Sequence, residues 1–294
     1  MDASIRRSAR SSGSAEMRIL ISHRTEYRFT EPQARVVQLL RMTPDSHLGQ
    51  NIVDWRIEVD CDARLKSRRD GFGNIVSMLY LEGPIERIGL SVTGEVLTED
   101  RAGVVNGAAN LLPAGVFLRP TELTTANAAI ATIGAPHGIN GSDPLGCAHS
   151  LCDEIHERIA CTADRSTDMR SAAEILEAGA GCSMDMAHVL IATARAAGFP
   201  ARFVTGYLSD DDAAPQQRHA PHFWAELHIP DYGWIGFDPA RECCPDEHYV
   251  RVAIGLDYRD AAPISGARIG GGHEVLRVGV EVSADADGQL QTQN

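Results

Sequence analysis

The chain of 294 residues is 44% hydrophobic and 23% charged, the ordinary composition of a soluble globular protein with one large or two moderate domains. Its formal net charge of -13 argues against sequence-independent binding to nucleic acid or to an anionic membrane, because both need a positive surface. No run approaches the roughly 18 uninterrupted apolar residues of a transmembrane helix. We therefore expect no nucleic-acid partner and no membrane partner.

The seven cysteines are scattered along the chain, are odd in number and include no CxxC pair. This pattern predicts neither a disulfide framework nor a structural zinc cluster, and scattered thiols favour a reducing cytoplasm. The first 16 residues are rich in Ser and Arg and lack the apolar segment of a signal peptide. We expect residues 1–16 and 285–294 to be disordered tails.

Residues 17–100 have the pattern of an antiparallel β domain. Apolar and polar residues alternate strictly over residues 53–61, which is the period of a strand with one buried face. The apolar face consists of Val53, Trp55, Ile57, Val59 and Cys61. Turn residues at 70–74 separate this strand from further strand-like runs, and residues 36–44 predict another strand. The first third is therefore expected to be a sheet, sandwich-like or barrel-like.

Residues 101–284 are expected to form a second unit of mixed helices and strands. Residues 100–142 are weakly patterned and predict a connecting region with one short helix. Helical spacing then predicts a helix within 143–160 and another over 183–197, the latter ended by a glycine and a proline. Strands are predicted at 201–208, 222–229 and 233–240. A last strand within 273–282 can return to the first sheet.

A nucleophile, a base and a carboxylate occur in an order that suits a cysteine hydrolase. Cys182 and Ser183 begin the second predicted helix, His222 begins a strand, and Asp238 ends the following strand. A helix N-terminus favours a thiolate and can hold an oxyanion. A histidine moves the proton, and a carboxylate orients the imidazole. If the two strands are neighbours, Asp238 can reach His222.

Three segments, GCSMDMAHVLIATARAAGFPARFVTGYL, HFWAEL and GWIGFDPA, resemble the core of the bacterial transglutaminase-like superfamily. Residues 17–29 and 36–44 are similar to the N-terminal β domain of its bacterial members, and residues 246–266 to the segment after the core. The resemblance implies an α+β fold, with a papain-like core whose nucleophile helix packs on an antiparallel sheet. It also implies a Cys–His–Asp triad with His222 as base and Asp238 as orienting carboxylate, with no cofactor and no metal, calcium included.

The resemblance leaves two candidates for the nucleophile. Related bacterial sequences resemble G-V-C-Q-D-F-A-H, in which the cysteine lies five residues before the histidine. Counting back from His188 gives Ser183, whereas a first turn shifted by one residue would place Cys182 in the slot instead. Side chains one residue apart on a helix diverge by about 100°, so both cannot face His222. A cysteine-to-serine replacement introduced by engineering would also produce the sequence GCSM at residues 181–184.

The favoured function is a transglutaminase-like acyl-transfer enzyme, a peptidase or amidase acting on peptide or isopeptide amides. The alternative is a pseudoenzyme, a peptide-binding or scaffold protein that keeps the cleft and has lost the thiol. Both imply a peptide or protein partner, and neither fixes the oligomeric state.

Other polar residues have structural interpretations. His188 is expected to be a core histidine or to lie behind the site. Asp185 is expected to be structural, either accepting a hydrogen bond near the helix start or supporting Arg202. Glu226 and His228 share the face of His222 on their strand, so either could line the cleft. Two adjacent cysteines and a histidine within 243–248 would chelate a metal ion poorly, and no metal is expected there.

Overall fold

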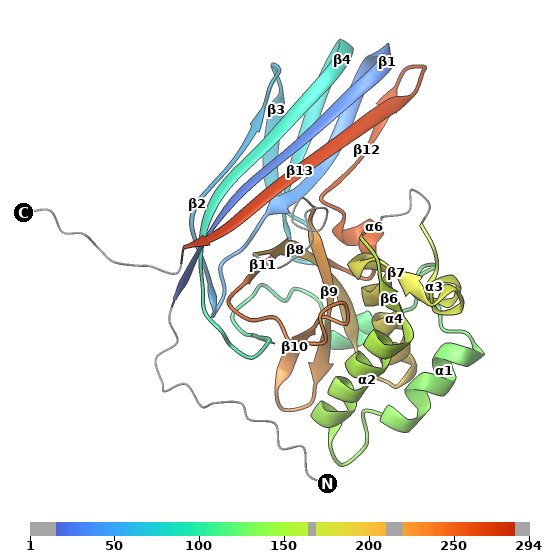
Figure 1. Ribbon diagram of the computed structural model, residues 1–294. Helices are drawn as coiled ribbons and strands as arrows, with labels where there is room; N and C mark the ends of the chain where they lie inside the picture. The colour runs from blue at the N-terminus through green and yellow to red at the C-terminus, as the bar shows by residue number, and fades with distance from the viewer. Residues whose placement is uncertain (1–15, 164–168, 210–219, 286–294) are drawn as a thin grey trace, which may run out of the picture.

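The computed structural model describes residues 16–163, 169–209 and 220–285, which form a sheet of long strands and a smaller sheet covered by helices (Figure 1). The predicted tails, 1–16 and 285–294, lie almost wholly outside the described residues. Most of the polar run SDDDAAPQQRHAP, which follows residue 208, also lies outside the described residues.

The first sheet is built on two long antiparallel strands, β1 and β4. β1 pairs with β13 over its first half and with β12 over its second half, and β4 pairs in the same way with β3 and then β2. The change of partner in β1 coincides with a shift of register between Arg28 and Gln33. The strands are β1 (Met17–Thr43), β2 (Gln50–Val59), β3 (Arg64–Arg69), β4 (Ile75–Thr98), β12 (Ile264–Ile269) and β13 (Glu274–Asp285).

The predicted apolar face of residues 53–61 is only partly correct. Trp55, Ile57 and Val59 pack against the apolar cluster of the first sheet. Val53 is 50% exposed, because a register shift between Ile52 and Asp54 breaks the alternation of β2. Cys61 is exposed and follows the end of the strand. The prediction was wrong at Val53 because a bulge leaves no clear sign in an alternating sequence, and at Cys61 because the strand ends at Val59.

The second sheet has the order β11-β8-β9-β10-β5, and its neighbouring strands are antiparallel. β9 lies between β8 and β10, which places the start of β9 near the end of β10. The predicted neighbourhood of the strands that carry His222 and Asp238 is therefore confirmed. The strands are β5 (Val104–Val105), β8 (Ala201–Leu208), β9 (His222–Ile229), β10 (Gly233–Phe237) and β11 (Tyr249–Gly255).

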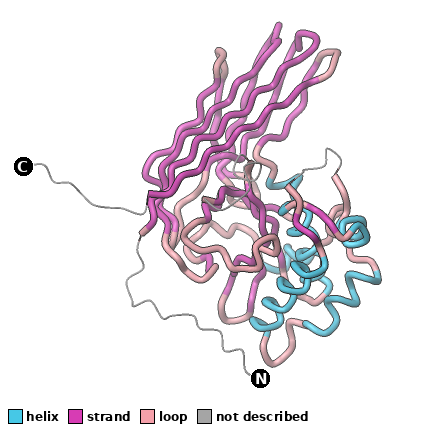
Figure 2. The backbone as a smooth tube through the Cα atoms, viewed as in Figure 1, coloured by secondary structure: helices cyan, strands magenta, loops and turns pink. Residues whose placement is uncertain are grey.

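Helices cover one face of the second sheet, with α4 packed directly on β8 and β9 and with α1, α2 and α3 around it (Figure 2). A short parallel pair, β6 (Ala160–Cys161) and β7 (Ala180–Gly181), precedes α4. The helical segments are η1 (Ala114–Leu118), α1 (Ala128–Gly134), η2 (Ala135–His137), α2 (Pro144–Arg158), α3 (Ala172–Ala178), α4 (Ser183–Ala196) and α6 (Tyr258–Ala261).

α4 is the centre of the second part, and its residues from Met184 to Arg195 are all buried. It ends where predicted, because Gly198 adopts φ +91° and the N–H of Phe199 closes back on the carbonyl of Ala194 at 2.9 Å. α2 and the short helix α1 also match the prediction. α3 was not predicted, although Ser171 and Glu174 form a capping box at its start.

The fold is α+β, with α4 packed on an antiparallel sheet and an antiparallel β domain before it. The predicted second unit, 101–284, contains β12 and most of β13, and both strands hydrogen-bond with β1. The end of the chain thus completes the first sheet (Figure 1). Within the described ranges, no helix combines the length and the apolar character needed to cross a membrane.

Candidate active site

Asp238 is held at the end of β10 by donors from three segments. Its carboxylate is fully buried. Oδ2 accepts a hydrogen bond from Nε2 of His222 at 2.5 Å and another from the hydroxyl of Tyr249 at 2.9 Å. Oδ1 accepts from the backbone N–H of Ala240 at 3.0 Å. The structure therefore brings the predicted base and carboxylate together and fixes the orientation of the carboxylate.

The His222 ring is positioned by two aromatic neighbours as well as by Asp238. The ring of Trp224 stacks on it at 6.2 Å between centroids, and the ring of Tyr249 meets it edge-on at 5.8 Å. Gly206 makes room for Trp224, since a Cβ at this glycine would lie 2.4 Å from the indole ring. Because Nε2 bonds to Asp238, Nδ1 is the ring nitrogen left to exchange a proton with a nucleophile.

The start of α4 places the two nucleophile candidates differently. Cys182 is the N-cap, with extended backbone, and its side chain is 5% exposed within the apolar cluster of the second part. Ser183 is the first helical residue and is half-buried. Asp185 accepts from the N–H of Cys182 at 3.1 Å and pairs with Arg170 at 2.7 Å, so it supports the helix start as expected.

Other cysteines surround Asp238, and sequence reasoning assigned them no place near the site. Burial and the nearby charge of Asp238 raise the pKa of Cys152 and that of Cys161. The pKa of Cys243 is also raised, chiefly by burial. These three sulfurs are therefore thiols rather than thiolates at neutral pH. Cys161 lies beside the nucleophile helix, since it pairs with Gly181 in the β6–β7 ladder.

His188 is a core histidine, as expected. It is 1% exposed, its Nε2 accepts from the N–H of Tyr258 at 3.1 Å, and its ring lies 4.8 Å from that of Phe203. Burial lowers the pKa of His188 to about 4, so the ring is neutral at physiological pH.

Glu226 belongs to a buried ion network on the same side of β9 as Trp224. It pairs with Arg202 at 2.5 Å and with Arg251 at 2.6 Å, and Arg202 lies 3.9 Å from the ring centroid of Trp234. Burial alone would raise the pKa of Glu226, but the two guanidinium groups lower it to about 2. Glu226 therefore ties three strands together. His228 is half-buried, and its ring meets that of Trp234 edge-on at 5.2 Å.

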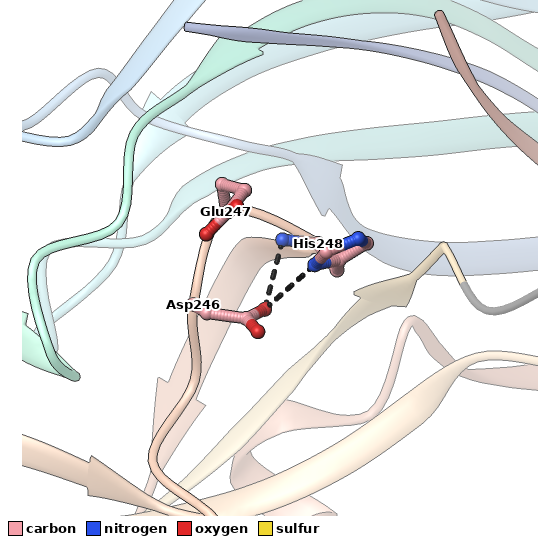
Figure 3. A group of neighbouring side chains, drawn as sticks. All are labelled: Asp246, Glu247 and His248. Carbon is pink, nitrogen blue, oxygen red and sulfur yellow. Dashed lines mark hydrogen bonds and ion pairs between the residues drawn. The ribbon is translucent and has the colours of Figure 1, made fainter. Parts of the chain in front are cut away.

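The residues considered for a metal between 243 and 248 separate into two groups. The ligand atoms of Asp246, Glu247 and His248 lie within 4.8 Å of one another, in a partly exposed turn (Figure 3). Asp246 accepts from both the backbone N–H and Nδ1 of His248, at 3.0 and 3.1 Å. Cys243 instead contacts the hydroxyl of Tyr249 at 3.4 Å. Among the described residues, His248 therefore groups with Asp246 and Glu247 rather than with the two cysteines.

Comparison with known proteins matches both parts of the chain. Residues 136–239 match the transglutaminase-like superfamily, and residues 19–97 match the bacterial transglutaminase-like N-terminal region. The chain therefore belongs to the bacterial transglutaminase-like superfamily.

Among its relatives is the uncharacterized protein Rv2569c of Mycobacterium tuberculosis, 28% identical over 85% of this chain and 87% of that protein. Another is the uncharacterized protein ML0607 of Mycobacterium leprae, 25% identical over 90% of this chain and 98% of its own. A crystal structure from Cytophaga hutchinsonii, provisionally described as a cysteine protease, superposes with a TM-score of 0.74 at 20% identity. It covers 94% of this chain and 93% of the other. This likeness supports the fold.

Proposed function

We propose that the protein is an acyl-transfer enzyme that acts as a peptidase or amidase on peptide or isopeptide amides. The observation that carries the proposal is the buried hydrogen bond between His222 and Asp238, at the start of β9 and the end of β10 in the sheet on which α4 packs. A buried carboxylate is costly unless its partners compensate, and here it holds an imidazole that keeps one nitrogen for proton transfer.

In the proposed cycle, the hydroxyl of Ser183 attacks the carbonyl carbon of the amide while Nδ1 of His222 accepts its proton. Asp238 stabilises the imidazolium that forms. Backbone N–H groups in the first turn of α4 stabilise the oxyanion. His222 then protonates the leaving amine, and the acyl group remains on the serine. A water molecule, deprotonated by His222, releases the acid and restores the enzyme.

Ser183 is the preferred nucleophile because it is the more accessible of the two candidates. It is half-buried at the first helical position, whereas Cys182 is 5% exposed and packs in the apolar cluster. A serine hydroxyl must lose its proton during the attack, so it depends on its base more than a thiolate does. The three hydrogen bonds to Asp238 fix the carboxylate that orients the base, His222, and so meet this dependence.

A second candidate function is a peptide-binding pseudoenzyme, and two observations favour it. Counting back from His188 without a shift puts a serine where related sequences resemble a cysteine, and the thiols of Cys152, Cys161 and Cys243 all have raised pKa values. A site shaped for a thiolate would then bind a peptide in its cleft without cleaving it.

Labelling with a serine-directed fluorophosphonate separates the two functions. For the enzyme we expect a single covalent adduct on Ser183, located by peptide mapping, that is lost in Ser183→Ala and in His222→Ala and kept in Cys182→Ala. The wild type should also hydrolyse members of a generic peptide-amide library. Absence of both the adduct and hydrolysis, with retained binding of peptides from that library, would establish the pseudoenzyme.

The substrate and the location follow from the same proposal. The substrate is a peptide or protein, and the reaction takes place in a reducing cytoplasm. The cysteines are scattered along the sequence and include no CxxC pair, which supports this location. Cell fractionation with antibody detection tests it, and recovery of the protein with a compartment outside the cytoplasm would contradict it.

A further inference from the structure

We propose that Tyr249 is a positioning residue of this site, which locks the Asp238 carboxylate in the orientation that aligns His222. The inference rests on the proposed function, because it assigns a role within the same proton-transfer pair. Sequence reasoning gave Tyr249 no role.

Tyr249 hydrogen-bonds with the carboxylate that orients His222. Its hydroxyl lies 2.9 Å from Oδ2 of Asp238, the same oxygen that accepts from Nε2 of His222 at 2.5 Å. Tyr249 begins β11, which is separated from β10 by β8 and β9 in the sheet. Its side chain therefore reaches Asp238 from outside the strands that carry the pair. A carboxylate held on Oδ2 by two donors and on Oδ1 by Ala240 cannot rotate without losing hydrogen bonds.

The direction of this hydrogen bond follows from the chemistry of both partners. An ionised carboxylate can only accept, so the phenol must donate. Burial, the charge of Asp238 and the nearby Cys243 raise the pKa of Tyr249 far above its usual range. The phenol therefore keeps its proton at every pH at which the fold would be studied.

The ring and the hydroxyl of Tyr249 act on different atoms. The ring packs edge-on against His222 at 5.8 Å and against Trp224 at 5.4 Å. The hydroxyl hydrogen-bonds with the carboxylate of Asp238 and lies 3.4 Å from Sγ of Cys243. Replacement by phenylalanine keeps the packing and removes the donor, so the role of the donor can be measured alone.

Removal of the hydroxyl should loosen the carboxylate. With one donor fewer, Oδ2 of Asp238 is held by His222 alone, and the carboxylate can rotate and weaken the hydrogen bond that aligns the ring.

The test uses nitrogen–proton correlation spectra of the histidine rings in the full-length protein. In the wild type we expect one set of His222 ring signals, with the Nε2 proton in slow exchange because it is held against Asp238. In Tyr249→Phe we expect this proton to exchange about tenfold faster, with a less uniform tautomer. The matched control is Tyr207→Phe, which removes a buried hydroxyl that lies 2.9 Å from Nδ1 of His23, and it should leave the His222 signals unchanged.

Identical exchange rates and ring signals of His222 in the wild type and Tyr249→Phe would overturn the proposal. A measurement on the wild type keeps the test decisive if the variant does not fold. The hydroxyl proton of Tyr249 should then be visible in slow exchange with water, with a cross-peak to the His222 ring, and its absence would also overturn the proposal. Neither readout needs catalysis, so a protein without acyl-transfer activity would refute the proposed function while leaving the role of Tyr249 measurable. In an active protein, Tyr249→Phe should lower kcat about tenfold and leave KM unchanged.

Discussion

The two halves of the candidate site are built in different ways. The base half consists of His222 and Asp238, and it is fixed by hydrogen bonds and ring contacts from β9, the end of β10 and β11. The nucleophile half is the first turn of α4, where two adjacent side chains compete for one role. The base half depends on long-range contacts, whereas the identity of the nucleophile is a local choice of one side chain. One side chain at the helix start can therefore change while the rest of the site stays intact.

The largest effect should come from the base half. Asp238→Asn keeps the size of the side chain and removes the charge that stabilises the imidazolium. We expect the rate of fluorophosphonate labelling, or of amide hydrolysis, to fall on the order of 10³- to 10⁴-fold. Asp246→Asn, in the partly exposed turn before β11, is the control and should change the rate less than twofold. A similar rate in Asp238→Asn and the wild type would mean that the carboxylate has no part in the chemistry.

The strand that carries His222, β9, also carries Glu226, the centre of the buried ion network. Glu226→Gln leaves the guanidinium groups of Arg202 and Arg251 buried without their counter-charge. We expect the free energy of unfolding to fall by about 3–5 kcal/mol, measured by urea denaturation. Glu122→Gln is the matched control, because Glu122 pairs with Arg259 at a surface position where it is 81% exposed, and its loss should cost almost nothing. Equal losses in the two variants would show that the network contributes little.

A smaller effect is expected on the pH dependence of the free energy of unfolding, through His188 on α4. Its pKa is lowered to about 4 in the folded protein, while the unfolded chain binds a proton near the ordinary value of about 6.5. The unfolded state therefore gains protons first as the pH falls, and stability is lost between about pH 6.5 and 4. His188→Gln keeps an acceptor for Tyr258 and does not titrate. We expect the loss of unfolding free energy over this window to shrink by about 2 kcal/mol in the variant, and an unchanged slope would contradict the assignment.

The smallest effect on reactivity is expected at Cys182. Because its side chain packs in the apolar cluster at the N-cap, Cys182→Ala should cost about 1 kcal/mol of stability and change the labelling rate less than threefold. Chemical denaturation and fluorophosphonate kinetics on the same preparation measure both quantities. Complete loss of reactivity in a folded Cys182→Ala protein would move the nucleophile to this residue.

Much of this architecture could be predicted from the sequence, because local patterns determine it. The cap and stop signals of α2 and α4 and the strict alternation of β9 are local, and so is the order of His222 and Asp238. Other features depend on contacts between distant segments. Tyr249 acquires its partner only when β11 folds beside the other strands, and the bulge that exposes Val53 depends on the pairing of β2 with β4. The same limit applies to Cys161, which approaches α4 through the β6–β7 pair.

The central claim is that the His222–Asp238 pair serves the side chain at position 183, and alkylation of Ser183→Cys tests it most directly. Iodoacetamide should modify this new thiol at pH 6 at least about 100-fold faster than the exposed Cys61, as measured by peptide mapping. The advantage should disappear in the His222→Ala background, because the imidazolium no longer stabilises the thiolate. A rate at position 183 no higher than that of Cys61, and unchanged by His222→Ala, would contradict the account.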